Sequence, residues 1–187
     1  MRQELDELLC QKYPKIFRDR QAPMTESCMH WGFECDDGWF NIIDQLCDSI
    51  QRHIDQNNEQ RVRAERYNSA LKAAFDGDIE RFITHLAYSG SSSARASARK
   101  RADEVLAKAV PDYRRVPPEK VQVVATQVKE KYGTLRFYYN RGDEFVSGLV
   151  AMAEAMSGVT CEICGTPGKP RGGRWIRTLC DEHAGDV

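Results

Sequence analysis

The sequence predicts an α+β protein that ends in a small zinc ribbon. Three observations support this fold class: helical spacing of apolar residues before residue 88, a β-hairpin pattern around Gly133, and two Cys/His pairs near the C-terminus. We expect a helical N-terminal part over 1–88, a flexible or variable insertion over 89–118, and a hairpin, helix and ribbon over 119–187. The first and last parts are expected to pack as one domain, because 187 residues suffice for one core and a small module.

The helical part is predicted from apolar residues that recur every three or four positions. A first helix is expected over 3–12, and Pro14 would end it. After an irregular stretch, Asp36 or Asp37 is expected to cap a second helix with the apolar stripe Trp39, Ile43, Leu46, Cys47, Ile50 and Ile54. Separate helices are expected over 59–75 and 79–86, and a mobile or surface helix over 94–109.

The character of the sequence changes at Val121. Residues 121–128 are rich in β-branched side chains, and Gly133 separates them from Thr134-Leu135-Arg136-Phe137-Tyr138-Tyr139, which predicts a β-hairpin. A helix capped by Asp143 is expected next. Its buried row is predicted to be Phe145, Leu149, Met152 and Met156.

The C-terminal pairs are Cys161-x-x-Cys164 and Cys180-x-x-His183, with the 15 residues Gly165 to Leu179 between them. Each pair can supply one edge of a tetrahedron, so the sequence predicts one structural zinc ion per chain and no position left for water. The alternative is a disulfide or a set of buried thiols. Seven cysteines and an N-terminus without the basic and apolar regions of a signal peptide argue against a disulfide framework.

A second group of metal-binding side chains is Cys28, His30 and Cys35. Their spacing matches no standard zinc knuckle, and free cysteines are usually buried, so core packing is the favoured interpretation over a second metal site. A Cys28/His30 catalytic pair is disfavoured, because a nucleophile and its base must meet within hydrogen-bond distance and nothing in this segment indicates that they do. We therefore predict no catalytic residue and no bound organic cofactor.

Two surfaces are candidates for macromolecular contact. The aromatic and acidic segment Trp31, Phe33, Glu34, Asp36 and Asp37 either fills the core or contacts a basic partner. The zinc loop carries cations around one indole ring, a pattern suited to nucleic acid: Lys169, Arg171, Arg174, Trp175 and Arg177. Acidic residues in the same module offset this charge.

Several segments together resemble a widespread family of proteins encoded by bacteriophages and prophages. They are Tyr13–Phe17, Trp31–Cys35, Arg66-Tyr67-Asn68, Val128–Tyr139, the zinc pairs and Trp175–His183. The resemblance implies a setting, the cytosol of an infected bacterium, and no particular mechanism. Accessory proteins of this kind often bind and inhibit a host protein, including components of anti-phage defence.

Together these observations predict a non-enzymatic zinc-binding accessory protein that binds a host macromolecule. A nucleic-acid-binding accessory protein is the first alternative, and a thiol- or metal-dependent hydrolase is the second. No apolar run reaches the roughly 18–20 residues of a membrane-spanning helix, so no membrane partner is expected. The oligomeric state and the identity of the partner are left open.

Overall fold

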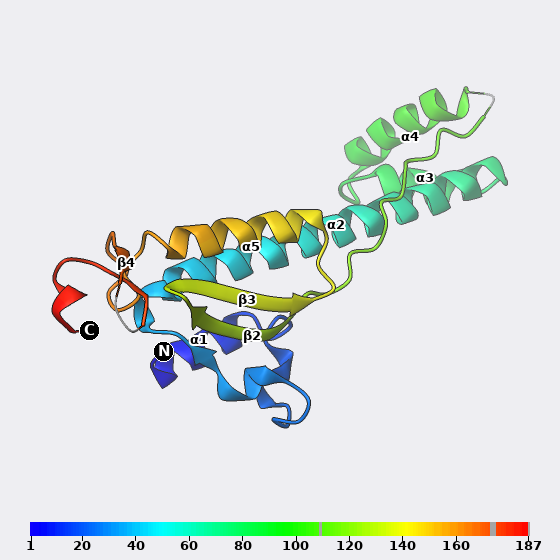
Figure 1. The fold of residues 1–187 in the computed structure, drawn as a ribbon. Coiled ribbons are helices and arrows are strands. Elements are labelled where there is room, and N and C mark those ends of the chain that lie inside the picture. The colour runs from blue at the N-terminus through cyan, green and yellow to red at the C-terminus, as the bar shows by residue number, and fades with distance from the viewer. Residues whose placement is uncertain (109, 173–174, 187) are drawn as a thin grey trace. The chain divides into compact units, whose positions relative to one another are not determined.

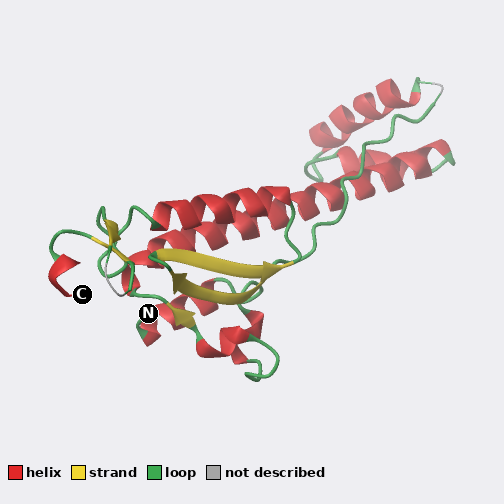
Figure 2. Ribbon diagram, viewed as in Figure 1, coloured by secondary structure: helices red, strands yellow, loops and turns green. Residues whose placement is uncertain are grey.

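The computed structural model describes residues 1–108, 110–172 and 175–186, and it confirms the α+β class (Figures 1 and 2). The helices are α1 (Gln3–Lys12), α2 (Phe40–Phe75), α3 (Ile79–Leu86), α4 (Ser92–Leu106) and α5 (Glu144–Ser157), with short 3₁₀ helices at Arg18–Gln21, Cys28–Trp31, Asp37–Trp39 and His183–Asp186. The strands are β1 (Phe33–Glu34), β2 (Val124–Lys131), β3 (Thr134–Asn140), β4 (Lys169–Arg171) and β5 (Arg177–Leu179).

The chain forms two compact units. Unit 1 comprises Met1–Ile54 and Val121–Val187, and unit 2 comprises Asp55–Lys120. Helix α2 therefore contributes its first part to unit 1 and its second part to unit 2. The predicted packing of 1–88 with 119–187 as one domain stays a prediction. No helix in the described part of the chain combines the length and the apolar character that crossing a membrane requires.

The central sheet of unit 1 has the order β1-β2-β3, in which β1 is parallel to β2 and β2 is antiparallel to β3. The predicted hairpin is confirmed, and Val128 pairs with Phe137 in its register. Its turn places Tyr132 and Gly133 at positive φ, of 56° and 79°. Leu135 and Phe137 are buried from the inner face of β3, as the alternation of apolar residues predicts.

Helix α5 lies along β3, and its side chains accept hydrogen bonds from backbone N–H groups on the edge of β3 that does not pair with β2. The backbone N–H of Leu135 donates to Oγ of Ser157 at 2.8 Å, and that of Phe137 donates to Oε1 of Glu154 at 3.1 Å. Unpaired strand edges otherwise recruit further strands, so these two side chains act where a fourth strand would bind.

The predicted stripe on the second helix is confirmed. Its members are buried in the main core together with Leu9, Phe17, Val128 and Phe137. The expected break before residue 59 is wrong, because α2 continues without interruption to Phe75. Residues 55–58 remain helical although they are polar. The side chains of Asn57 and Asn58 are hydrogen-bonded there: they donate to the carbonyls of Pro118 and Lys120, at 2.8 and 3.0 Å.

The prediction of a buried row on α5 is wrong. Phe145, Met152 and Met156 are exposed, and the residues that α5 buries are Val146, Val150, Ala153 and Ser157. The helix is thus rotated relative to the expected orientation, because its hydrogen bonds to the β3 edge fix Ser157 on the inner side. The predicted cap is confirmed, since Asp143 accepts a 3.0 Å hydrogen bond from the N–H of Val146.

Unit 2 has its own small core between the second part of α2, α3 and α4. Leu71, Phe82 and Ile83 are buried there, and the α4 residues Ala98 and Ala102 allow close packing because their side chains are small. Asp78 caps α3 by accepting a hydrogen bond from the N–H of Arg81. Helix α4 occupies much of the segment 89–118; that this segment is flexible or variable stays a prediction.

Candidate metal centre

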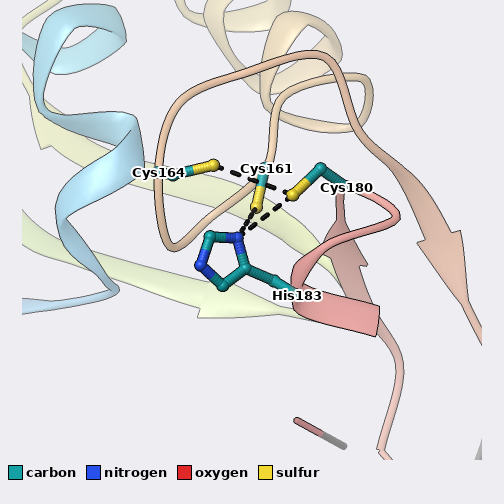
Figure 3. A group of neighbouring side chains, drawn as sticks. All are labelled: Cys161, Cys164, Cys180 and His183. Carbon is teal, nitrogen blue, oxygen red and sulfur yellow. Dashed lines mark hydrogen bonds between the residues drawn. The ribbon is translucent and has the colours of Figure 1, made fainter. Parts of the chain in front are cut away.

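The four predicted ligands come together at the C-terminal end of unit 1 (Figure 3). Their ligand atoms all lie within 4.8 Å of one another. Sγ of Cys164 is 3.8 Å from Sγ of Cys180, and Nδ1 of His183 is 3.7 Å from Sγ of Cys161 and 3.1 Å from Sγ of Cys180. Figure 3 shows all four side chains converging on one point, with Nδ1 as the histidine atom that faces the sulfurs.

This spacing fits a tetrahedral zinc ion. Zn–S bonds of about 2.3 Å and Zn–N bonds of about 2.0 Å imply edges of about 3.8 Å between two sulfurs and about 3.5 Å between sulfur and nitrogen. The observed S···S distance of 3.8 Å and S···N distances of 3.1 and 3.7 Å lie around those values. Three thiols and one imidazole are also a donor set that zinc favours.

The backbone of the first pair forms a tight knuckle. The N–H of Gly165 donates to the carbonyl of Cys161 at 2.8 Å, and the N–H of Cys161 donates to the carbonyl of Thr166 at 2.7 Å. Gly165 has φ of +78°, a conformation that a side chain would strain. The second pair follows β5, which pairs antiparallel with β4, so the module has the two-stranded form predicted for a ribbon.

The knuckle packs directly on the backbone that precedes α2. The N–H of Gly38 donates to the carbonyl of Glu162 at 2.7 Å, and Nε1 of Trp39 donates to the carbonyl of Thr160 at 2.9 Å. On the other side, the hydroxyl of Thr178 donates to the carbonyl of Gly133 at 2.6 Å. The module is therefore attached both to the start of α2 and to the hairpin turn.

An ion cluster around the buried Glu162 joins the module to the segment that precedes α2. Glu162, only 3% exposed, accepts a hydrogen bond from Nε of Arg177 at 3.2 Å and one from the N–H of Asp36 at 3.2 Å. The guanidinium of Arg177 also pairs with Asp36. Burial raises the pKa of Glu162, and Arg177 opposes that rise. The carboxylate of Glu162 thus accepts hydrogen bonds both from the ribbon, through Arg177, and from the segment before α2, through Asp36.

The thiols of the cluster differ in their environments. A hydrogen bond from the backbone N–H of His183 contributes most to lowering the pKa of Cys180 to about 6. The hydroxyl of Thr166 lowers the pKa of Cys164, whereas burial raises that of Cys161. Zinc binds thiolates, so the polar donors around Cys164 and Cys180 favour the ligand form.

Cys28, His30 and Cys35 are not brought together as a metal site; in the described ranges the Cys161 group is the one such cluster. Cys28 is exposed and Cys35 is buried in the main core. Burial raises the pKa of Cys35 to about 12, which disfavours its thiolate. Nδ1 of His30 lies 3.0 Å from the carbonyl of Ala22, so this ring has a partner within its own loop.

The aromatic and acidic segment divides between core and surface. Phe33 is buried against Phe17, whereas Trp31 is 63% exposed. Asp36 pairs with Arg177, and Asp37 pairs with Arg2 at 2.6 Å. Neither aspartate caps α2 through its side chain, so the predicted capping role is wrong. Glu34 is exposed and accepts a hydrogen bond from Gln127 at 3.0 Å.

The cations of the zinc loop are occupied by carboxylates of the same unit. Arg171 pairs with Asp181, Lys169 lies 3.5 Å from the same carboxylate, and Arg177 joins the buried cluster. Nε1 of Trp175 donates to Glu130 at 3.1 Å while the ring remains 65% exposed. Arg174, the remaining predicted contact, lies outside the described residues.

Two important residues of this centre were not predicted as such. Glu162 lies between the predicted ligands Cys161 and Cys164. The sequence alone does not show that this carboxylate is buried, because its burial depends on the pairing with Arg177, 15 residues later. Gly38 gives no local signal, because its importance comes from a contact with a segment more than a hundred residues later. Comparison with protein-family models, curated proteins and solved structures finds no match to this chain.

Proposed function

We propose that Cys161, Cys164, Cys180 and His183 hold one structural zinc ion, and that the protein acts by binding a macromolecule and not by catalysis. The convergence of four protein donors within 4.8 Å carries this proposal. Four protein ligands complete a tetrahedron, so neither water nor a substrate has a free coordination position on the metal. Such an ion stabilises the fold, because its binding free energy becomes folding free energy.

The position of the centre supports a structural role. The ligand knuckle contacts Gly38 and Trp39 at the entrance to α2 and reaches the hairpin turn through Thr178. An ion that fixes the knuckle would therefore hold in place the start of the longest helix and one end of the sheet. The proposed ion would therefore stabilise the contacts between these segments and would not take part in a reaction.

We further propose that the zinc-stabilised protein is a phage or prophage accessory protein that works in the bacterial cytosol and binds a host protein, such as a component of anti-phage defence. The family resemblance of segments from both ends of the chain supports this setting. A zinc site of thiolates also suits a reducing compartment.

Elemental analysis of the purified protein tests the metal assignment. We expect about one zinc per chain, as four protein donors form one tetrahedral site. Cys164→Ser should lose the metal and lower the melting temperature. Cys28→Ser changes an exposed thiol outside the cluster, so this variant should keep the metal and the wild-type melting temperature. A well-folded wild-type protein without metal would refute the proposal.

Nucleic-acid binding is the second candidate function, and one observation favours it. On the hairpin, the ammonium groups of Lys129 and Lys131 lie over the rings of Tyr138 and Tyr132, at 5.8 and 5.5 Å from the ring centres. Cations beside accessible aromatic rings suit a single-stranded nucleic acid, whose phosphates and bases they can contact.

A pull-down from bacterial lysate with and without nuclease separates the two candidates. A protein partner retained after nuclease treatment supports host-protein binding, and signal lost with nuclease supports the second candidate. Direct titration with a single-stranded oligonucleotide completes the test. Lys131→Glu should weaken such binding, while Lys100→Glu, an equally exposed charge reversal on α4, should not.

A further inference from the structure

Helix α5 presents an apolar row to solvent. Phe145, Met152 and Met156 on the helix are 54%, 57% and 48% exposed, Leu149 between them is half-buried, and Val159 just beyond the helix is 63% exposed. These five residues are spaced by four, three, four and three positions. That spacing is the a/d pattern of helices that pack side by side. Leu149 packs against the main core, and the other four residues are exposed.

The row is uncharged along α5, and at one end the imidazole of His53 stacks on Phe145, with ring centres 4.3 Å apart. Between Glu144 and Glu154, α5 contains no ionisable residue. Glu154 does not face the row, because it accepts the N–H of Phe137 and approaches Arg136 on β3. The exposed residues Ala151 and Ala155 lie beside the row, and side chains this small allow a second helix to approach closely.

A groove of about 230 Å³ runs beside the row, between α5 and the first part of α2. Its apolar walls are Ile42 and Leu46 of α2 and Leu149, Met152 and Met156 of α5, and all of its lining residues are uncharged. Methionine side chains adapt readily to the shape of a partner. A groove between two helices is the form of site that receives the apolar face of a third helix.

We propose that this surface binds a second copy of the chain, so that α5 of each copy packs against the α2/α5 groove of the other. The surface is self-complementary, since α5 supplies both the apolar row and one wall of the groove, as a two-fold symmetric contact requires. The absence of charge between Glu144 and Glu154 removes the repulsion that identical surfaces would otherwise meet.

The available apolar area fits a weak dimer. A large apolar side chain that is half exposed offers about 100 Å², so the row offers roughly 400 Å² per copy. A standard interface uses about 800 Å² per partner, so the row supplies about half of it. Ile42 and Leu46 on the α2 wall are only 9% and 4% exposed and add little. This inference goes beyond the proposed function and does not depend on the identity of a host partner.

Light scattering coupled to size exclusion tests the proposal on the full, metal-loaded protein over a range of concentrations. We expect the wild-type mass to approach twice that of one chain as concentration rises. Met152→Lys places a charge in the middle of the row and should return the mass to that of one chain at unchanged melting temperature and metal content. Val62→Lys, an apolar-to-lysine change at an exposed position of α2, should remain dimeric.

A mixing experiment tests the two-fold arrangement directly. Met152 is the central residue of the five, so a symmetric contact places it near its counterpart. Met152→Glu alone should also be monomeric, and an equimolar mixture with Met152→Lys should regain the doubled mass through opposite charges. A wild-type protein that stays monomeric at all concentrations would overturn the proposal, as would a folded Met152→Lys variant that remains dimeric.

Discussion

The N–H of Gly38 donates a 2.7 Å hydrogen bond to the carbonyl of Glu162, the residue that follows the proposed metal ligand Cys161. The contact is so close that glycine is needed at position 38. A β-carbon there would lie 2.5 Å from the amide nitrogen of Gly165 and 2.6 Å from the carbonyl oxygen of Glu162, and it would overlap the carbonyl of Cys161. The metal centre and the start of α2 are thus fitted to each other through backbone atoms.

Gly38→Ala should therefore destabilise the protein and weaken metal retention. The obstructing atoms belong to the backbone of the knuckle, so relief requires the knuckle to move, and we expect a loss of about 2 kcal/mol or more. Thermal denaturation and competition with a zinc chelator measure the two effects. Gly90→Ala is the matched control, because a β-carbon at Gly90 meets nothing within 4 Å. Equal stability of the two variants would contradict the close contact.

Arg177→Gln should cost more stability than Arg171→Gln, although both arginines belong to the ribbon. Arg177 compensates Glu162, whose side chain is 4% exposed, whereas Arg171 pairs with Asp181, whose side chain is 86% exposed. Leaving a buried charge without its partner costs about 3–5 kcal/mol, and losing a surface pair costs about 1 kcal/mol or less. Urea denaturation of both variants at the same ionic strength provides the comparison. Similar losses would mean that Glu162 does not depend on Arg177.

Ser157→Ala should destabilise unit 1 by about 1–3 kcal/mol, the cost of leaving a buried donor without an acceptor. Its hydroxyl oxygen accepts the N–H of Leu135, and both residues are fully buried. Ser69→Ala removes an exposed acceptor for Arg81 and serves as the control, with an expected change within about 0.5 kcal/mol. Hydrogen exchange of the Leu135 amide should also accelerate in the Ser157 variant. An unchanged exchange rate would show that this edge is protected in another way.

Alkylation of the native, metal-loaded protein near neutral pH should label Cys28 first. Cys28 is exposed, whereas Cys35 and Cys47 are buried and burial raises the pKa of both thiols. A raised pKa keeps the thiol protonated, and the protonated form reacts slowly. Mass spectrometry of peptides at increasing times gives the order of labelling. Rapid labelling of Cys35 would show that the core opens, and protection of Cys28 by added zinc would revive the hypothesis of a second metal site.

The sequence was sufficient where the pattern and the physical cause are both local. The apolar stripe from Trp39 to Ile54, the hairpin at Gly133 and the ligand spacing from Cys161 to His183 are confirmed by the structure. The sequence was insufficient where contacts between residues far apart in the chain determine the local structure. The polar stretch before residue 59 stays helical with Asn57 and Asn58 bonded to the chain near Pro118, and Arg177 draws Asp36 away from a capping role.

Helix α5 illustrates the same limit for a surface. The spacing of Phe145, Leu149, Met152 and Met156 predicts a buried row, but Phe145, Met152 and Met156 are exposed, because periodicity alone does not show which face of a helix meets the core. Within the chain the inner face of α5 is fixed by hydrogen bonds of Ser157 and Glu154 to β3, which no apolar pattern encodes.

The division of unit 1 into two stretches has a consequence for synthesis on the ribosome. Residues 55–120 form a contiguous unit that can fold as soon as it emerges. Gly38 and Trp39 are made early, but the carbonyls of Glu162 and Thr160 that bind them appear more than a hundred residues later. The N-terminal stretch must therefore wait, with its aromatic residues uncovered, until the metal ligands have left the exit tunnel. Translation speed and the supply of the proposed zinc ion at that moment would then govern the yield of folded protein.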